Sequence, residues 1–224
     1  MNAKILLKEY PEFNLYEYEK GIYLIELNSA ADAMYLLRLQ ETYDHPIYKN
    51  KYFDILEYIE EYIKGYGKGV FSYTLDFCGF NINNSVFKLV YSFNFIKNKY
   101  DIRMYEIYTL IQERIGNKKF CVLGYKKGDG PTFLHELHHA YFYLNTEYRK
   151  EMKALVKELQ VFYPERWEFI KKDLANSLYD EKTFIDEAAA YLCSGPTNWK
   201  VDKILVSKFK KLFKKYYNGE SNEK

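Results

Sequence analysis

The chain has 224 residues and a formal net charge of +2 at pH 7, with 48% hydrophobic and 29% charged residues. This balance is typical of a globular protein with a buried core, and it argues against a disordered chain. The small net charge gives no reason to expect a nucleic-acid partner, and no apolar run approaches the roughly 18 residues that a membrane span needs.

The first half of the chain is expected to mix strands and helices, because its apolar residues follow both the two-residue and the helical period. Ser29 is placed to cap a helix, and Gly65 and Gly116 are placed to end two others. The expected elements are strands over 21–27, 70–77, 86–95 and 119–125, a turn-rich segment at 79–84, and helices over 29–43, 53–64 and 101–115.

Helices dominate the second half, at about 131–144, 146–160, 164–176, 182–193 and 200–217. The sequence therefore predicts an α+β fold with a small mixed sheet and a helix-rich C-terminal half. A seam at 99–101 would divide the chain into an N-terminal α/β region, 1–100, and a second region, 101–224, with one domain over 1–224 as the alternative.

The last expected helix has an apolar stripe opposite a face rich in lysine. We expect the stripe to pack on the core and the lysines to face solvent, as in many terminal helices. Contact of this basic face with an acidic partner, a membrane surface or nucleic acid is the weaker alternative.

The three cysteines, Cys78, Cys121 and Cys193, are widely spaced and include no C-x-x-C pair. A disulfide framework or a cysteine-rich zinc ribbon is therefore not expected, and a reducing compartment is the natural inference. The segment 1–11 lacks the long apolar run of a signal peptide. We expect a cytoplasmic protein.

Three of the four histidines fall within five residues, in the run His135-Glu136-Leu137-His138-His139, which matches H-E-x-x-H. Residues four apart lie on one face of a helix, so His135 and His139 can direct imidazole nitrogens at one zinc ion. Glu136 lies about 100° around the helix, which suits a general base on a water better than a third ligand. His138 could pair with His135 at a spacing of three, but a supporting or solvent-facing role is preferred.

A catalytic zinc usually takes three protein ligands and one water, so a third ligand has to come from elsewhere. Phe142 and Asn145 stand where the longer H-E-x-x-H-x-x-G-x-x-H pattern needs Gly and His, which excludes the metzincin pattern. His45, in a turn-like segment far upstream, is a minor candidate.

The better candidates lie in the downstream helix, where two acids precede three alanines at 188–190. Glu187 shares a helical face with the apolar Phe184 and Tyr191, so it is expected to point inward and is the preferred third ligand. Asp186 is the alternative. Whichever acid is not the ligand can orient a ligating histidine.

An H-E-x-x-H pair followed by a distant Glu on a second helix resembles the gluzincin metallopeptidases, the broad class that includes thermolysin. Over about 119–195, the resemblance implies His135, His139 and Glu187 as ligands of one zinc ion and Glu136 as the catalytic base. It also implies a zincin-like fold, in which an edge strand, here 119–125, binds peptide by β-augmentation. Thermolysin has E-x-x-x-D, but Tyr191 stands at the Asp position here, so a histidine-orienting Asp must come from another position.

The residues therefore predict a zinc-dependent metallopeptidase that acts on a protein or peptide. Tyr191, with Tyr179 as the alternative, is the candidate donor to the developing oxyanion. Two other functions are consistent with the motif: a zinc-binding interaction module without activity, and a zinc hydrolase of a non-peptide amide. The general base Glu136 favours an enzyme, because structural zinc sites need no base and are usually closed by four cysteine-rich ligands.

Overall fold

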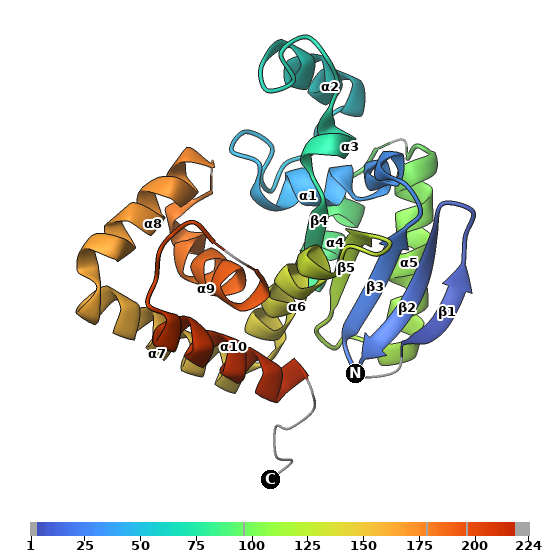
Figure 1. The fold of residues 1–224 in the computed structure, drawn as a ribbon. Coiled ribbons are helices and arrows are strands. Elements are labelled where there is room, and N and C mark those ends of the chain that lie inside the picture. Colours follow the sequence, from blue (N-terminus) through green and yellow to red (C-terminus); the bar gives the residue numbers. More distant parts are fainter. Residues whose placement is uncertain (1–3, 96, 178, 196, 218–224) are drawn as a thin grey trace. The chain divides into compact units, whose positions relative to one another are not determined.

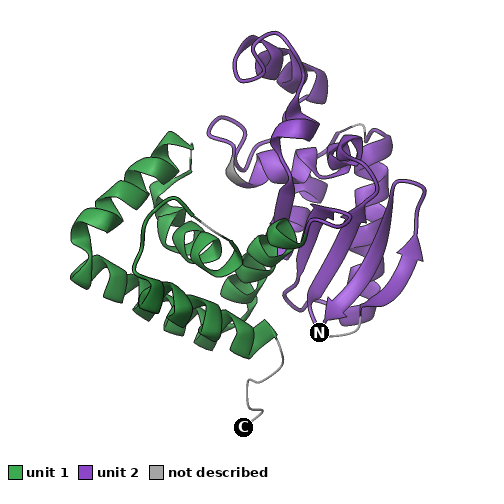
Figure 2. Ribbon diagram, viewed as in Figure 1, with its two compact units in different colours: residues 1–3, 130–224 green, residues 4–129 purple. Residues whose placement is uncertain are grey.

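The structure, a computed structural model, describes residues 4–95, 97–177, 179–195 and 197–217 (Figure 1). The chain divides into two compact units, one over residues 4–129 and one that begins at Gly130 (Figure 2). The seam expected at 99–101 is not where these units divide, because the helix and the strand that follow it belong with the N-terminal sheet.

A five-stranded mixed sheet runs through the first unit. Its strands are β1 (Ile5–Glu9), β2 (Phe13–Glu19), β3 (Ile22–Leu27), β4 (Gly79–Asn83) and β5 (Cys121–Lys126). The first three form an antiparallel meander, β5 pairs in parallel with β3, and β4 pairs antiparallel with β5, in the order β1-β2-β3-β5-β4. The strands expected at 21–27 and 119–125 and the α+β class are confirmed.

The strand β5 occupies an inner position of this sheet, between β3 and β4. Its backbone is therefore paired on both sides, along Ile22–Leu27 and along Gly79–Asn83. The expectation that 119–125 is an edge strand that binds peptide by β-augmentation is wrong, because β-augmentation needs an unpaired edge. The edges of the sheet are β1 and β4.

The helical elements of this unit connect the strands. They are η1 (Ala30–Tyr35), α1 (Leu37–Asp44), α2 (Ile55–Lys64), α3 (Tyr73–Asp76), α4 (Asn84–Ser92) and α5 (Lys99–Ile115). Ser29 caps the start as expected, in a capping box with Asp32, but the helix opens as a 3-10 turn and continues as α1 only from Leu37. Gly116 ends α5 with a φ of +65°, a conformation that favours glycine.

The strands expected over 70–77 and 86–95 are wrong, and so is the turn expected at 79–84. The runs rich in Val, Phe and Tyr form α3 and α4, whereas the segment between them is β4. Asn83 explains the start of α4, since its side chain accepts a hydrogen bond from the Ser85 amide at 3.0 Å. In β4, Phe80 and Ile82 alternate with polar residues and are buried, so tertiary packing overrides the turn propensity of the asparagines.

The second unit is built from helices alone in its described residues. They are α6 (Gly130–Leu144), α7 (Thr146–Phe162), α8 (Pro164–Asn176), η2 (Glu181–Thr183), α9 (Phe184–Ser194) and α10 (Lys203–Tyr217). The five helices expected here are confirmed. Helix α9 contacts α6, α7, α8 and α10, so it is the centre of the unit (Figure 1). Its alanines 188–190 are fully buried, and these small side chains let α6 approach closely.

The C-terminal helix α10 packs as expected. Leu205, Phe209 and Phe213 are buried, while Lys208 pairs with Glu158 across to α7. None of the helices in the described residues is long and apolar enough to cross a bilayer. The three cysteines are all free thiols.

Candidate metal centre

His135 and His139 lie one turn apart on α6 and face the same position. Their Nε2 atoms are 3.1 Å apart, and their rings cross at 77°. Two facing imidazole nitrogens at this distance cannot both carry a hydrogen, so at least one presents a lone pair. The side chains are 15% and 12% exposed, so each keeps a small contact with solvent.

Glu187 on α9 brings a carboxylate to these nitrogens. Its Oε2 lies 3.4 Å from His135 Nε2, and its Oε1 lies 3.6 Å from His139 Nε2. Tetrahedral ligands with bonds of about 2.0–2.2 Å stand about 3.3–3.6 Å from one another, so these separations fit one metal ion bound in this way. Glu187 Oε2 is buried and makes no hydrogen bond within the described residues, which a bound cation would compensate. His135, His139 and Glu187 thus form a group that can hold a metal ion.

Asp186, one residue earlier, meets the other side of the His139 ring. Its Oδ2 lies 3.1 Å from His139 Nδ1, and its Oδ1 lies 3.2 Å from His138 Nε2. A hydrogen on Nδ1 that points at this carboxylate leaves the lone pair of His139 on Nε2, toward Glu187. The geometry therefore gives the two adjacent acids different partners: Glu187 faces the two Nε2 atoms, and Asp186 faces Nδ1.

His138 is fully buried, which rules out the solvent-facing role considered from the sequence. Its Nδ1 lies 2.6 Å from the Tyr148 hydroxyl on α7. Burial lowers the pKa of His138, so that its ring is neutral near pH 7 and can accept the tyrosine hydrogen at Nδ1. The contacts thus run from Tyr148 through His138 and Asp186 to His139.

A second group that could hold a metal consists of His138, His139 and Asp186. The two groups share His139, so they are alternatives. Buried atoms without a hydrogen bond occur in both groups: Glu187 Oε2 in the first, and His138 Nε2 and Asp186 Oδ1 in the second. The group with His135 is favoured, because its two Nε2 atoms face each other at 3.1 Å. A neutral His138 ring that accepts the Tyr148 hydrogen at Nδ1 carries its own hydrogen on Nε2, which leaves no lone pair there for a metal.

The charges around the site favour a cation. Burial is the main cause that raises the pKa of Glu136. The nearby histidines act to lower this pKa, and the neighbouring carboxylates act to raise it further. Burial alone would lower the pKa of His139, but Asp186 and Glu187 outweigh it and hold that pKa well above the usual value. Burial would raise the pKa of Glu187, yet His139 and His135 keep it low, so this carboxylate is anionic. Two anionic carboxylates, those of Asp186 and Glu187, thus lie against the two ligand-type histidines, which makes the centre attractive to a divalent cation.

Tyr191 on α9 packs its ring against His135, with centroids 4.6 Å apart. Its hydroxyl lies 3.0 Å from that of Tyr179. Burial is the main cause that raises the pKa of both tyrosines, so both keep their hydrogens near pH 7. One of the two hydroxyl hydrogens lies between the two oxygens. The second hydroxyl hydrogen can therefore be donated to a third group.

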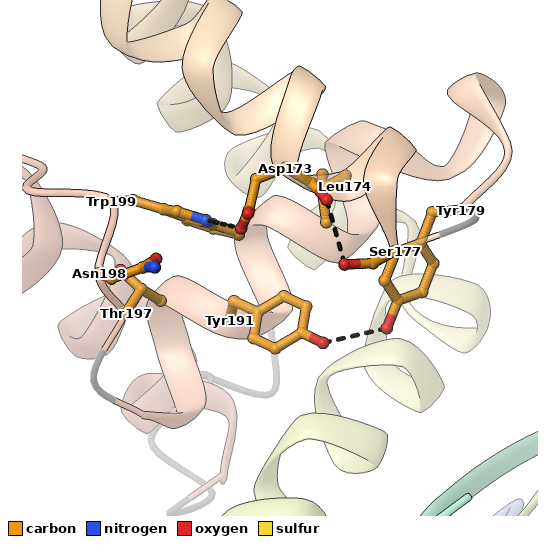
Figure 3. A pocket seen from close by; sticks show the side chains of 8 residues that line it. All are labelled: Asp173, Leu174, Ser177, Tyr179, Tyr191, Thr197, Asn198 and Trp199. Atoms are coloured by element: carbon orange, nitrogen blue, oxygen red, sulfur yellow. Dashed lines mark hydrogen bonds between the residues drawn. The ribbon is translucent and has the colours of Figure 1, made fainter. Parts of the chain in front are cut away.

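A pocket of about 300 Å³ lies beside this tyrosine pair, entirely within the helical unit (Figure 3). Tyr179 and Tyr191 form part of its wall, so the pocket adjoins the candidate metal centre. Its other lining residues are Asp173, Leu174, Ser177, Thr197, Asn198 and Trp199.

His45 does not join either candidate group in the described residues. It belongs to the unit of residues 4–129, where its Nδ1 accepts hydrogen bonds from the amides of Ile47 and Tyr48. The minor expectation that His45 supplies the third ligand is therefore not supported.

No pattern in the sequence pointed to Tyr148 as the partner of His138, or to the pocket formed around Asp173 and Trp199. A chain with 25 tyrosines gives no signal that singles out one of them. The spacing of ten residues between His138 and Tyr148 spans two helices, so only the packing of α6 on α7 reveals the contact.

No protein-family model, curated protein or solved structure matches this chain. What the structure establishes is a mixed α+β chain whose helical unit carries a His/His/Glu group able to hold a metal ion. Which metal ion this group would bind, and which reaction it would support, depend on the chemistry of the side chains around it.

Proposed function

We propose that this protein is a zinc-dependent metallopeptidase whose site consists of His135, His139, Glu187 and the base Glu136. The observation that carries the proposal is the convergence of two imidazole Nε2 atoms and one carboxylate within 3.6 Å of one another, next to a buried glutamate. Two histidines and one glutamate are a donor set found in catalytic zinc sites, which keep one position for water.

In this proposal, each side chain has a separate task. When bound, zinc lowers the pKa of a coordinated water to about 7 and polarises a carbonyl group. Glu136 takes a proton from the attacking water and passes it to the leaving amine nitrogen. Asp186 holds the hydrogen of His139 on Nδ1 and so fixes the ring and its tautomer.

Tyr191, with Tyr179 behind it, is the proposed donor to the carbonyl oxygen as negative charge develops there. The support is the 4.6 Å approach of its ring to His135 and the spare hydrogen of the hydroxyl pair. Preorganised donors of this kind stabilise the transition state more than the ground state.

A direct test combines metal content with cleavage. We expect the wild-type protein to bind one zinc ion and to cleave an unstructured protein such as casein, with new termini detected by mass spectrometry. In Glu136→Gln, zinc binding should persist while turnover falls by on the order of 10²–10⁴-fold, because the general base is lost. Glu147→Gln, at an exposed position of α7, is the matched control and should behave as wild type.

Each failure points to a different error. Wild-type protein that binds no zinc would refute the metal centre. Zinc binding without cleavage of any peptide or protein would favour a non-catalytic module or a hydrolase of another amide. Full activity in Glu136→Gln would refute the assignment of the base.

A further inference from the structure

The pocket beside the tyrosine pair has a composition that suggests what it binds. Three of its lining residues, Tyr179, Tyr191 and Trp199, are aromatic, and their rings stand nearly at right angles. The Tyr191 and Trp199 rings are 5.4 Å apart at 70°, and those of Tyr179 and Tyr191 are 6.5 Å apart at 82°. An aromatic ring that lines a pocket can attract a cation through the negative potential of its face.

The charge of the pocket points the same way. Among its eight lining residues, Asp173 is the only ionisable carboxylate, and there is no lysine, arginine or histidine. Its Oδ2 accepts a hydrogen bond from the Trp199 indole nitrogen at 2.7 Å, which holds the carboxylate at the pocket wall (Figure 3). No cation pairs with Asp173 in the part of the chain that the structure describes, so its second oxygen can receive a donor from a ligand.

The position of the pocket links it to the metal centre. Tyr191 lines the pocket and also packs on His135, so one aromatic ring separates the two sites. A volume of about 300 Å³ lies at the lower end of the usual range for ligand pockets, which suits one side chain rather than a large molecule. A side chain held there would bring its own backbone next to the metal centre.

We propose that this pocket is the substrate subsite and selects a basic side chain, lysine or arginine, in the peptide. The proposal rests on the proposed peptidase function for its biological meaning. The ammonium or guanidinium group pairs with Asp173, while the aliphatic stem lies against Tyr191 and Trp199.

Binding can be measured without catalysis, because the chain has only two tryptophans, Trp167 and Trp199. In metal-free Trp167→Phe protein, the fluorescence of Trp199 reports on the pocket alone. We expect n-butylammonium to give a saturable change that n-butanol, its neutral counterpart, does not give. Adding Asp173→Asn should weaken this binding by about tenfold, because a hydrogen bond to a charged group is lost while the amide oxygen still accepts from Trp199.

Glu168→Gln is the matched control, since Glu168 lies on the same helix α8 but pairs with Lys171 outside the pocket. It should leave the titration unchanged. Equal responses to n-butylammonium and n-butanol, no response to either, or an Asp173→Asn variant that binds the ammonium as well as its parent would each overturn the cation site.

Cleavage then tests the link to substrate. Peptides that differ only by lysine or norleucine at one position should differ in kcat/KM, and Asp173→Asn should reduce that preference by about tenfold. A preference that survives in Asp173→Asn would overturn the subsite. If no peptide is cleaved at all, the proposed peptidase fails, whereas the fluorescence titration still decides the cation site.

Discussion

The two compact units bury charge in different ways. In the unit of residues 4–129, the Arg38 guanidinium donates to Asp101 at 2.7 Å and to the Phe53 carbonyl at 2.6 Å. Asp101 also accepts a hydrogen bond from the backbone amide of Asn98, so both charged groups of this buried pair have hydrogen-bond partners within the protein. In the helical unit, the carboxylates of Asp186 and Glu187 meet histidines at 3.1–3.6 Å, and one buried Glu187 oxygen has no hydrogen bond within the described residues.

This difference distinguishes a structural ion pair from a candidate metal centre. A buried charge is tolerated when its own partners satisfy it, as Arg38 and Asp101 satisfy each other. Donors that face a shared position at coordination distances, with an excess of carboxylates, are satisfied best by a cation from solution. The stability of the first arrangement should therefore be independent of metal, and that of the second should depend on it.

The largest expected effect comes from breaking the buried ion pair between Arg38 and Asp101. Arg38→Met should lower the free energy of unfolding by about 3–5 kcal/mol, because it leaves Asp101 charged and buried without its partner. Chemical denaturation with and without zinc measures this loss, and it should be equal in both conditions. Lys64→Met, which removes an exposed pair with Glu60, is the control and should cost far less. A loss that appears only when zinc is withheld would contradict the contrast between the units.

The next effect concerns the proposed third ligand. Glu187→Gln should weaken zinc binding by about 10²–10³-fold, since about 10–16 kcal/mol shared among the four ligands of a structural zinc site gives about 2.5–4 kcal/mol for each. Competition with a chromophoric chelator measures the affinity, and zinc should no longer raise the melting temperature of the variant. Glu181→Gln, at an exposed position of η2, serves as the control. Wild-type affinity in Glu187→Gln would exclude this residue as a ligand.

The smallest effect is expected from changing the carboxylate that orients one of the proposed histidine ligands. Asp186→Asn should reduce zinc affinity by about 10–100-fold, which is typical for the loss of a partner that orients a ligating histidine. The same chelator competition measures it, so the two variants can be ranked directly. If Asp186→Asn lost more affinity than Glu187→Gln, the second group, with His138 and Asp186 as ligands, would be the correct one.

The two halves of the chain also differed in how well their sequence predicted their structure. The helices of the second unit follow a clear helical period, and each was found near its expected bounds. In residues 70–95, aromatic and β-branched runs favoured strands, but the Asn83 cap and the burial of Val86, Phe87 and Val90 on one face made a helix. Propensity there is a weak guide, because long-range packing decides between two patterns of similar local cost.

Local spacing along the chain was enough to predict one half of the candidate site. Helix geometry puts His135 and His139 on one face wherever the helix lies, and it puts Glu136 beside them. Which acid meets which nitrogen could not be predicted in this way. Asp186 and Glu187 are neighbours in sequence, and their partners depend on how α9 packs on α6. Long-range pairing likewise placed β5 inside the sheet and Tyr148 on His138. Local spacing does not encode contacts of this kind.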